Sequence, residues 1–376
     1  MSKLEELIQE LCPDGVEFKA IKEEYQRLKG TPITASKMKE IQSDSGDIRI
    51  FAGGKTVIDA HEKDIPNANI TRVPAVLVQS RGVIDAVYYE SPFTFKNEMW
   101  AYTHKEKTSV KYLYYVLKNN IERFREAASG MGSLPQISLR VTEDFVMPIP
   151  PLPVQSEIVR ILDNFSELTS ELTAELTARK KQYEYYTKEL FNLNDSVKIL
   201  KLAEIADIGT GSSNTNEAVE SGLYPFFVRS QEPLKKNQYE YDETAIITAG
   251  DGVGVGKVFH YVEGKYALHQ RAYRIHFNTT AVLPKYYFYY MKSTFLEYIQ
   301  KTMFHGSVSS IRRPMLNEYP VPVPSLEEQK HIVNILDCFD ALCNDLTSGL
   351  PAEIEARQKQ YEYYRDKLLT FKELEV

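Results

Sequence analysis

The sequence predicts an α+β protein in which two globular domains of α/β type are separated by two long antiparallel helices, with a pseudo-two-fold internal repeat. IVRILDNF at 158–165 recurs as IVNILDCF at 332–339, and RKKQYEYYTKEL at 179–190 recurs as RQKQYEYYRDKL at 357–368. Both pairs lie in stretches that have the apolar spacing of a coiled coil. We therefore divide the chain into a first domain, a central helix, a second domain and a C-terminal helix, at 1–150, 151–193, 194–325 and 326–376.

The two globular blocks are predicted to be mixed α/β, because runs of β-branched and aromatic residues alternate with Gly, Pro and Asn. Aromatic-rich helices are expected at 108–125 and 284–302, and the proline that begins the second suits a helix N-terminus. Strands are expected at 48–51, 75–78, 84–89, 226–228, 245–248, 257–261 and 272–275.

Each long helix is predicted to follow a proline-rich hinge, at 148–153 and at 320–324. Closely spaced prolines exclude a helix and favour an extended backbone. Acidic residues come next, as the first turn of a helix favours.

Apolar residues then recur at steps of three and four, which predicts a seam along each helix. An apolar seam needs a partner, and the helix of the other copy is the simplest one. The seam residues are Ile158, Ile161, Phe165, Leu168, Leu172, Leu176, Tyr183 and Tyr186 in the first helix, and Ile332, Ile335, Phe339, Leu342, Leu346, Tyr361 and Tyr364 in the second.

The two helices are not exact copies. The offset between the repeats is 174 for the first segment and 178 for the second, so the second helix has four extra residues, around 348–351. Gly349 and Pro351 stand there, and together they predict a break or a kink.

The glycine-rich run at 249–257 is predicted to be a β-hairpin. It lacks the glycine and the Ser or Thr that a phosphate-binding loop requires, and its glycines alternate in a way that no dinucleotide fingerprint does. Strand-like residues flank it on both sides. Its counterpart at 76–89 keeps Gly82, aligned with Gly256, but not the neighbouring glycines.

No catalytic or metal-binding motif stands out. The seven histidines are scattered, and neither a G-x-S-x-G motif nor the Asn-Pro-Pro-aromatic motif of amino-group DNA methyltransferases occurs. Three cysteines cannot build a disulfide framework, which favours a reducing compartment. We expect no membrane span and no secretory signal, because no apolar run is long enough and the N-terminal segment is acidic.

Polar and basic residues gather on the predicted turns of both blocks. Arg, Lys, Asn and Gln match the hydrogen-bonding edges of guanine and adenine, and Ser, Thr and glycine amides suit phosphates. The net charge of −7, however, argues against a protein that binds DNA alone. The candidate residues are Lys29, Thr31, Ser36, Lys37, Lys55, Ser80, Arg81, Lys96 and Asn97 in the first block, and Ser212, Ser213, Arg229, Ser230, Gln231, Lys257, Gln270, Arg271, His305, Ser307, Arg312 and Arg313 in the second.

Taken together, the chain resembles the specificity (S) subunits of type I restriction–modification enzymes. The resemblance rests on LCPDGVE at 11–17, the duplicated ILD and KQYEYY segments, and the Glu-Leu-Thr-Ala tetrapeptides at 171–178. It covers essentially the whole chain.

The resemblance implies a function for each part. Each globular block would be a target recognition domain that reads one half of a bipartite sequence in double-stranded DNA. The helices would set the spacing between the halves and dock two modification subunits, which methylate adenine, while restriction subunits join to cleave DNA. This chain would be a cytoplasmic, non-catalytic subunit without a cofactor of its own, and S-adenosylmethionine, magnesium and ATP would be bound by its partners.

Two other interpretations stay open at this stage. One is a coiled-coil adaptor or scaffold without DNA specificity. The other is a modification enzyme in its own right, which methyl transfer by the isolated chain would establish.

Overall fold

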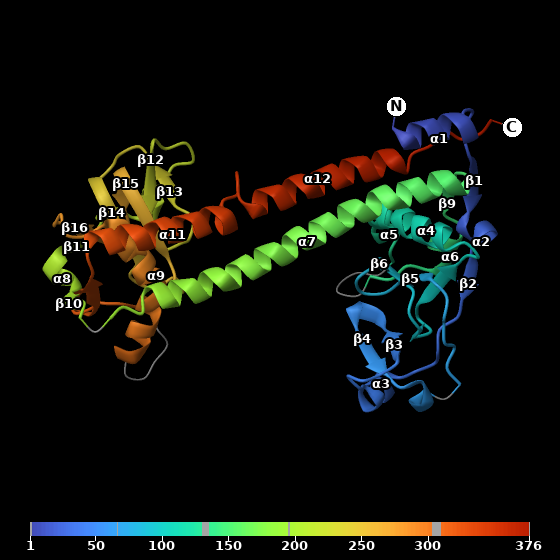
Figure 1. Cartoon of the computed structure of the whole chain (residues 1–376), viewed down its shortest axis with the longest axis horizontal. Coiled ribbons are helices and arrows are strands. Elements are labelled where there is room, and N and C mark those ends of the chain that lie inside the picture. The colour runs from blue at the N-terminus through green and yellow to red at the C-terminus, as the bar shows by residue number, and fades with distance from the viewer. Residues whose placement is uncertain (1, 66, 130–134, 195, 303–309, 376) are drawn as a thin grey trace. The chain divides into compact units, whose positions relative to one another are not determined.

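A computed structural model describes residues 2–65, 67–129, 135–194, 196–302 and 310–375. These residues form two compact units, Met1–Leu172 with Ile354–Val376, and Thr173–Glu353. We call them unit 1 and unit 2 (Figure 1). Each unit contains one globular lobe and part of the long helices, so the boundaries of the units fall within the helices and not at the ends of the lobes.

The lobe of unit 1 contains three small sheets, with strand orders β1-β9, β2-β8-β5-β6 and β4-β3-β7. Its strands are β1 (Glu17–Ala20), β2 (Gln26–Leu28), β3 (Ile48–Phe51), β4 (Val57–Ala60), β5 (Ala75–Gln79), β6 (Asp85–Tyr89), β7 (Phe93–Phe95), β8 (Trp100–Thr103) and β9 (Val146–Ile149). Its helices are α1 (Lys3–Leu11), α2 (Ile21–Glu24), α3 (Ala35–Ile41), α4 (Lys107–Asn119), α5 (Ile121–Glu126) and α6 (Leu139–Glu143), with 3-10 turns at Gly53–Lys55 and Glu62–Asp64.

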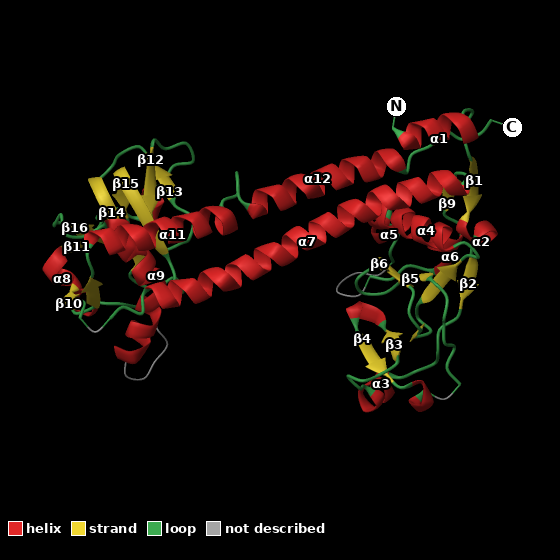
Figure 2. Ribbon diagram, in the orientation of Figure 1, coloured by secondary structure: helices red, strands yellow, loops and turns green. Residues whose placement is uncertain are grey.

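The lobe of unit 2 has one larger sheet, β11-β16-β14-β15-β12-β13, and the pair β10-β17 (Figure 2). Its strands are β10 (Lys198–Lys201), β11 (Ala206–Thr210), β12 (Tyr224–Phe227), β13 (Leu234–Lys236), β14 (Tyr241–Ala249), β15 (Phe259–Leu268), β16 (Ala272–Phe277) and β17 (Pro320–Val323). Its helices are α8 (Leu202–Ile205), α9 (Pro284–Thr302) and α10 (Arg313–Asn317), with a 3-10 turn at Thr215–Glu217.

The internal repeat extends through both lobes. The order β2-β8-β5-β6 matches β11-β16-β14-β15, with equivalent antiparallel pairings. In unit 1, β3 runs parallel to β7, and in unit 2, β12 runs parallel to the end of β15. The two lobes are therefore versions of one fold, as the duplicated helical segments predicted.

The glycine-rich hairpin is confirmed, because β14 and β15 pair antiparallel up to Thr248 opposite Phe259. Its counterpart joins β5 to β6. Gly82 and Gly256 both have left-handed backbone conformations, with φ of 76° and 69°, a region that favours glycine. The loop of unit 2 spans 250–258 and that of unit 1 spans 80–84, so unit 2 has four more residues at this turn.

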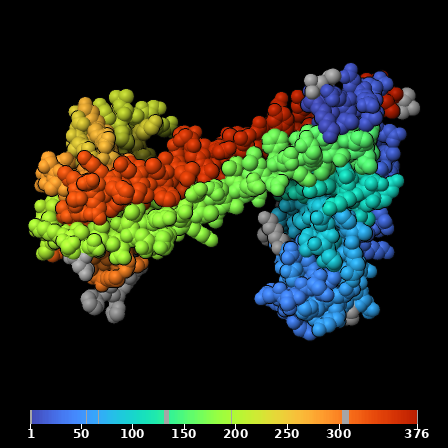
Figure 3. Space-filling view, in the orientation of Figure 1, coloured from blue at the N-terminus to red at the C-terminus, as the bar shows by residue number. Residues whose placement is uncertain are grey.

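In unit 1, the first part of α7 (Leu152–Leu190) packs against α12 (Leu350–Leu368). The ring of Phe165 stacks on Tyr364, with centroids 5.7 Å apart, and meets Tyr361 edge-on at 6.4 Å. Ile158 and Leu162 are fully buried in the same core as Leu369, so the two helices run antiparallel. Helix α1 covers this end of the pair, as Figure 3 shows in blue.

In unit 2, the rest of α7 packs against α11 (Leu326–Asn344). Tyr183 and Tyr186 lie 5.9 and 5.8 Å from Phe339, measured between ring centroids. Cys343, which the predicted seam omits, is buried, and burial raises the pKa of its thiol. Leu342, a predicted seam residue, is 38% exposed instead.

The predicted break in the second helix is confirmed. Helix α11 ends at Asn344 and α12 begins at Leu350, and between them Asp345 accepts hydrogen bonds from the backbone and the hydroxyl of Thr347 at 2.7 and 2.6 Å. Leu346 was predicted to be a seam residue, and this is wrong: it lies between the helices and is 75% exposed.

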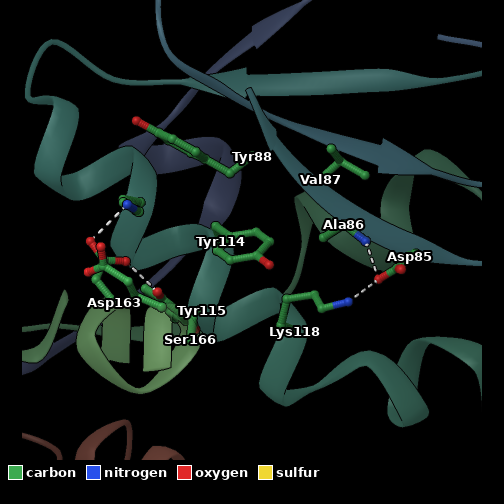
Figure 4. Close-up of a pocket in the computed structure, with 11 residues that line it drawn as sticks. Asp85, Ala86, Val87, Tyr88, Tyr114, Tyr115, Lys118, Asp163 and Ser166 are labelled. Carbon is green, nitrogen blue, oxygen red and sulfur yellow. Dashed lines mark hydrogen bonds and ion pairs between the residues drawn. The ribbon is translucent and has the colours of Figure 1, made fainter. Parts of the chain in front are cut away.

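The aspartate of each ILD segment ties its long helix to the aromatic helix of the same lobe. Asp163 on α7 accepts the hydroxyl of Tyr115 at 2.5 Å and pairs with Lys111 at 2.8 Å (Figure 4). In unit 2, Asp337 on α11 likewise accepts the hydroxyl of Tyr289 at 2.6 Å. Lys285 pairs with Asp337 at 2.9 Å, as Lys111 does with Asp163. These repeated contacts show that the two ILD segments occupy equivalent positions in the two units.

We expect Asp163→Ala to lower the free energy of unfolding by about 1–3 kcal/mol, because it removes both the hydrogen bond from the Tyr115 hydroxyl and the ion pair with Lys111. Urea unfolding measures this change. Glu171→Ala on the same helix is the matched control, since Glu171 is exposed, and we expect it to stay within about 0.5 kcal/mol of the parent. Equal losses in the two variants would contradict the role given to Asp163.

Candidate nucleic-acid interface

Four loops of unit 1 come together at one edge of its sheets. They are the turn after β2, the 3-10 turn after β3, the β5–β6 hairpin and the turn after β7. The backbone N–H of Thr31 donates to the carbonyl of Phe95 at 2.6 Å, and that of Lys96 donates to Phe51 at 3.0 Å. The hydroxyl of Ser80 donates to the carbonyl of Glu98 at 2.5 Å. These bonds hold the loops against one another.

The equivalent four loops of unit 2 are held together in the same way. The backbone N–H of Ser213 donates to the carbonyl of Leu268 at 3.3 Å, and that of His269 donates to Phe227 at 2.9 Å. The third contact joins the hairpin to the turn after β15, where the N–H of Gly250 donates to the carbonyl of Arg271 at 2.9 Å. The repeat therefore places one loop cluster in each unit.

Most of the candidate residues are accessible on these clusters or near them. Lys37 and Lys96 are half-buried, Lys55 lies in the 3-10 turn after β3, and His305 and Ser307 lie outside the described residues. The exposed candidates are Lys29, Ser36, Arg81, Asn97, Ser212, Arg229, Ser230, Gln231, Lys257, Gln270, Arg271, Arg312 and Arg313.

Three candidates are buried and do not belong to an interface. Thr31 shares a hydrogen bond of 2.6 Å with Thr94. Ser80 is fully buried, and its hydroxyl donates to the carbonyl of Glu98. The hydroxyl of Ser213 accepts from Lys236 at 2.5 Å and donates to Glu240. Small polar side chains in closely packed loops form hydrogen bonds with buried polar groups. The sequence of a turn does not show which of its side chains are packed in this way.

Two further candidates lie away from the clusters. Ser36 and Lys37 are on α3, whose buried residues pack against β3 and β4. Lys37 pairs with Glu40 at 2.7 Å. By contrast, Arg312 and Arg313 begin α10 directly after Ile311, which is bonded to the hairpin of unit 2.

The structure also adds residues that the sequence analysis missed. Asp251, in the hairpin of unit 2, pairs with Arg229 at 2.6 Å and with Arg271 at 3.2 Å. Val253, in the same hairpin, is 97% exposed. Val253 and Val255 both stand between two glycines, so the sequence did not distinguish the exposed valine from the buried one. The ion pairs had no sequence signal, because their partners are far apart in the chain.

Two stretches of the chain, residues 13–179 and 194–356, match the family model of the type I restriction modification DNA specificity domain. The chain belongs to this family. The membership confirms the resemblance carried by the duplicated ILD and KQYEYY segments. It also confirms the prediction that the chain is the specificity component of a larger enzyme.

Relatives of this specificity subunit support the assignment along most of its length. The EcoR124I/EcoR124II specificity subunit of Escherichia coli is 35% identical over 295 residues, which cover 70% of this chain and 72% of the relative. A putative type I specificity subunit of Haemophilus influenzae is 33% identical over 305 residues, covering 73% and 77%. The crystal structure of an S subunit from M. genitalium shares the fold, with a TM-score of 0.67 at 16% identity over 94% of this chain and 96% of that one.

The two specificity domains carry different charges on the same loop frame. In unit 2 the cluster has two arginines and one aspartate. Equivalent positions in unit 1, judged from the strand pairings, hold Gly53, Arg81 and Glu98, and Glu98 pairs with Lys96 at 2.9 Å. Two domains with one fold and different side chains at one edge would recognise different partners.

Two arginines set the electrostatics around Asp251 in unit 2. Burial raises the pKa of the Asp251 carboxyl, but the hydrogen bonds and charges of Arg229 and Arg271 outweigh it and hold the pKa below its usual range. Burial and the charge of Arg229 lower the pKa of His269, which disfavours its protonated form. Two arginines and one carboxylate leave one positive charge among these three side chains.

Among the described residues of this specificity subunit, no group of three or more His, Cys, Asp or Glu side chains is placed to hold a metal ion. None of the described helices has the length and apolar character to cross a membrane.

Proposed function

We propose that this chain is the DNA-reading subunit of a type I restriction–modification complex, and that each lobe recognises one half of a bipartite target in double-stranded DNA. One observation carries the proposal: a duplicated loop frame presents exposed Arg, Lys, Asn and Gln side chains, with different residues in each copy. Such side chains supply the donors that read base edges in the major groove. Different residues on one frame favour an asymmetric target.

The long helices would set the distance between the two half-sites and dock two modification subunits. In each unit α7 packs antiparallel to a second helix, and the ILD aspartate ties the lobe to that pair. Restriction subunits would complete the complex in the cytoplasm. S-adenosylmethionine, magnesium and ATP would then belong to the partners, and the net charge of −7 implies that partner subunits supply many of the phosphate contacts.

Sequencing methylated adenines in a host that carries the whole system tests this function. We expect methylation at one asymmetric sequence made of two short specific parts and an unspecified gap. Deleting the gene for this chain should abolish the pattern. Methylation without a bipartite sequence would overturn the proposal.

The net charge of −7 favours a second candidate, a coiled-coil adaptor without DNA specificity. The two candidates differ in how binding depends on salt, because each phosphate contact releases counterions. DNA binding by the assembled complex should weaken steeply as salt rises if the chain reads DNA, and weak, salt-insensitive binding would favour the adaptor.

A further inference from the structure

Three side chains from three separate loops meet in unit 2. Arg229 follows β12, Asp251 lies in the β14–β15 hairpin, and Arg271 lies between β15 and β16. Each carboxylate oxygen of Asp251 accepts one N–H, at 2.6 Å from Arg229 and at 3.2 Å from Arg271. The side chains of Arg229 and Arg271 are 42% and 60% exposed, against 25% for Asp251. The carboxylate therefore lies deeper and the two guanidinium groups face outward.

The backbone beneath this cluster is held firmly. The N–H of Arg271 donates to Nδ1 of the buried His269 at 3.0 Å, and the N–H of Gly250 donates to the carbonyl of Arg271 at 2.9 Å. A Cβ at Gly254 would come within 2.6 Å of the carbonyl of Arg229, so the hairpin packs closely on that loop too. The three side chains thus start from well-defined positions.

Each arginine uses only NH1 in these ion pairs among the described residues. The rest of each guanidinium can still meet an outside acceptor. A guanidinium bonds the O6 and N7 atoms of guanine in a bidentate manner, which is worth about 1–3 kcal/mol of discrimination against a wrong base. A free arginine loses side-chain entropy when it is ordered, and an existing partner reduces that loss on binding.

We propose that Asp251 is a positioning residue that sets the specificity of this lobe, by presenting Arg229 and Arg271 as paired donors to guanine. Its negative charge also weakens binding to DNA that offers no guanine acceptors, because it opposes the phosphates and leaves the cluster with one net positive charge. The inference rests on the proposed function and adds the base type and the residues that select it. Unit 1 has glycine and glutamate at the arginine positions, so the device belongs to the half-site read by unit 2.

The test uses D251N, which removes the charge and keeps the size of the side chain. The complex of this chain with its modification subunits is measured by DNA binding and by methylation of the parent target. Targets with single base-pair changes in each half-site are compared at two salt concentrations. We expect roughly a tenfold loss of discrimination at a guanine of one half-site, with the other half-site unaffected. We also expect tighter binding to non-cognate DNA, most clearly at low salt.

Two further variants separate positioning from charge. R271K keeps the positive charge but loses the planar fork, so it should relax the same guanine position. Lys257→Ala is the matched control, since Lys257 is exposed in the same hairpin and has no ion pair with Asp251. It should weaken binding to all sequences without changing which base is preferred.

Three outcomes decide the matter. If D251N weakens cognate and non-cognate binding equally, Asp251 only supports the fold, and an unfolding midpoint lowered in parallel would show this. If D251N and R271K leave base preference unchanged, the arginines do not read guanine, and this inference fails while the proposed function stands. If the parent complex distinguishes no bipartite target, the proposed function itself fails.

Discussion

Exchanging residues 1–150 for the corresponding lobe of another type I specificity subunit will change one half of the DNA target and leave the other half unchanged. The four interface loops of unit 1 all lie within this stretch, and those of unit 2 all lie outside it. The junction is favourable, because β9 ends at Ile149 and α7 begins at Leu152. Sequencing of methylated adenines before and after the exchange measures the result.

The exchange has one structural requirement. The core of unit 1 includes Ile158 and Leu162 of α7, and Tyr115 is bonded to Asp163 across the junction. The donor lobe must therefore keep a tyrosine and a lysine at the positions of Tyr115 and Lys111. Exchange of 194–325 is the reciprocal control and should alter the other half-site alone. A change in both half-sites after either exchange would contradict the assignment of one half-site to each lobe.

The elements that the sequence predicted best are those with local signals. Helix α9 begins at the predicted residue, Pro284, because proline favours the first turn of a helix, and it continues to Thr302, where the described stretch stops. The hairpin and the break near Gly349 followed from glycine and proline, whose backbone preferences act within a few residues. The internal repeat predicted the paired plan of two lobes and two long helices, because repeated segments can be recognised in the sequence without knowing which residues are in contact.

The interface was harder to predict, because exposure and pairing depend on distant residues. Ser80 and Arg81 are neighbours in a turn, yet one is fully buried and the other exposed. Asp251 became a candidate only when folding brought Arg229 and Arg271 to its two oxygens. Leu346 matches the heptad spacing of the sequence, but the backbone is not helical between Asn344 and Leu350, so Leu346 does not lie on a helix face. Periodicity describes a face of a helix, and it fails where the helix stops.

Deleting Glu171–Ala174 will shorten the unspecified gap of the target without changing either half-site. Helix α7 is continuous for 39 residues, and the deletion removes one of its Glu-Leu-Thr tetrapeptides. Four helical residues span about 6 Å and turn the helix by about 40° beyond one full turn. One base pair advances about 3.4 Å along the DNA axis and turns by about 35°. We therefore expect the gap to lose one or two base pairs, as read from methylated adenines.

The tetrapeptide repeat makes this deletion tolerable. Removing Glu171–Ala174 brings Glu175 and Leu176 into the places of Glu171 and Leu172. An exposed glutamate then replaces an exposed glutamate, and a half-buried leucine replaces a half-buried leucine. Glu171→Ala keeps the helix length and serves as the control, with an unchanged gap. Inserting one more Glu-Leu-Thr-Ala unit should lengthen the gap by the same amount. If the deletion altered a half-site, or left the gap unchanged, the helices would not act as the spacer, because the deletion changes only the length and rotation of α7 and leaves the residues of both lobes in place.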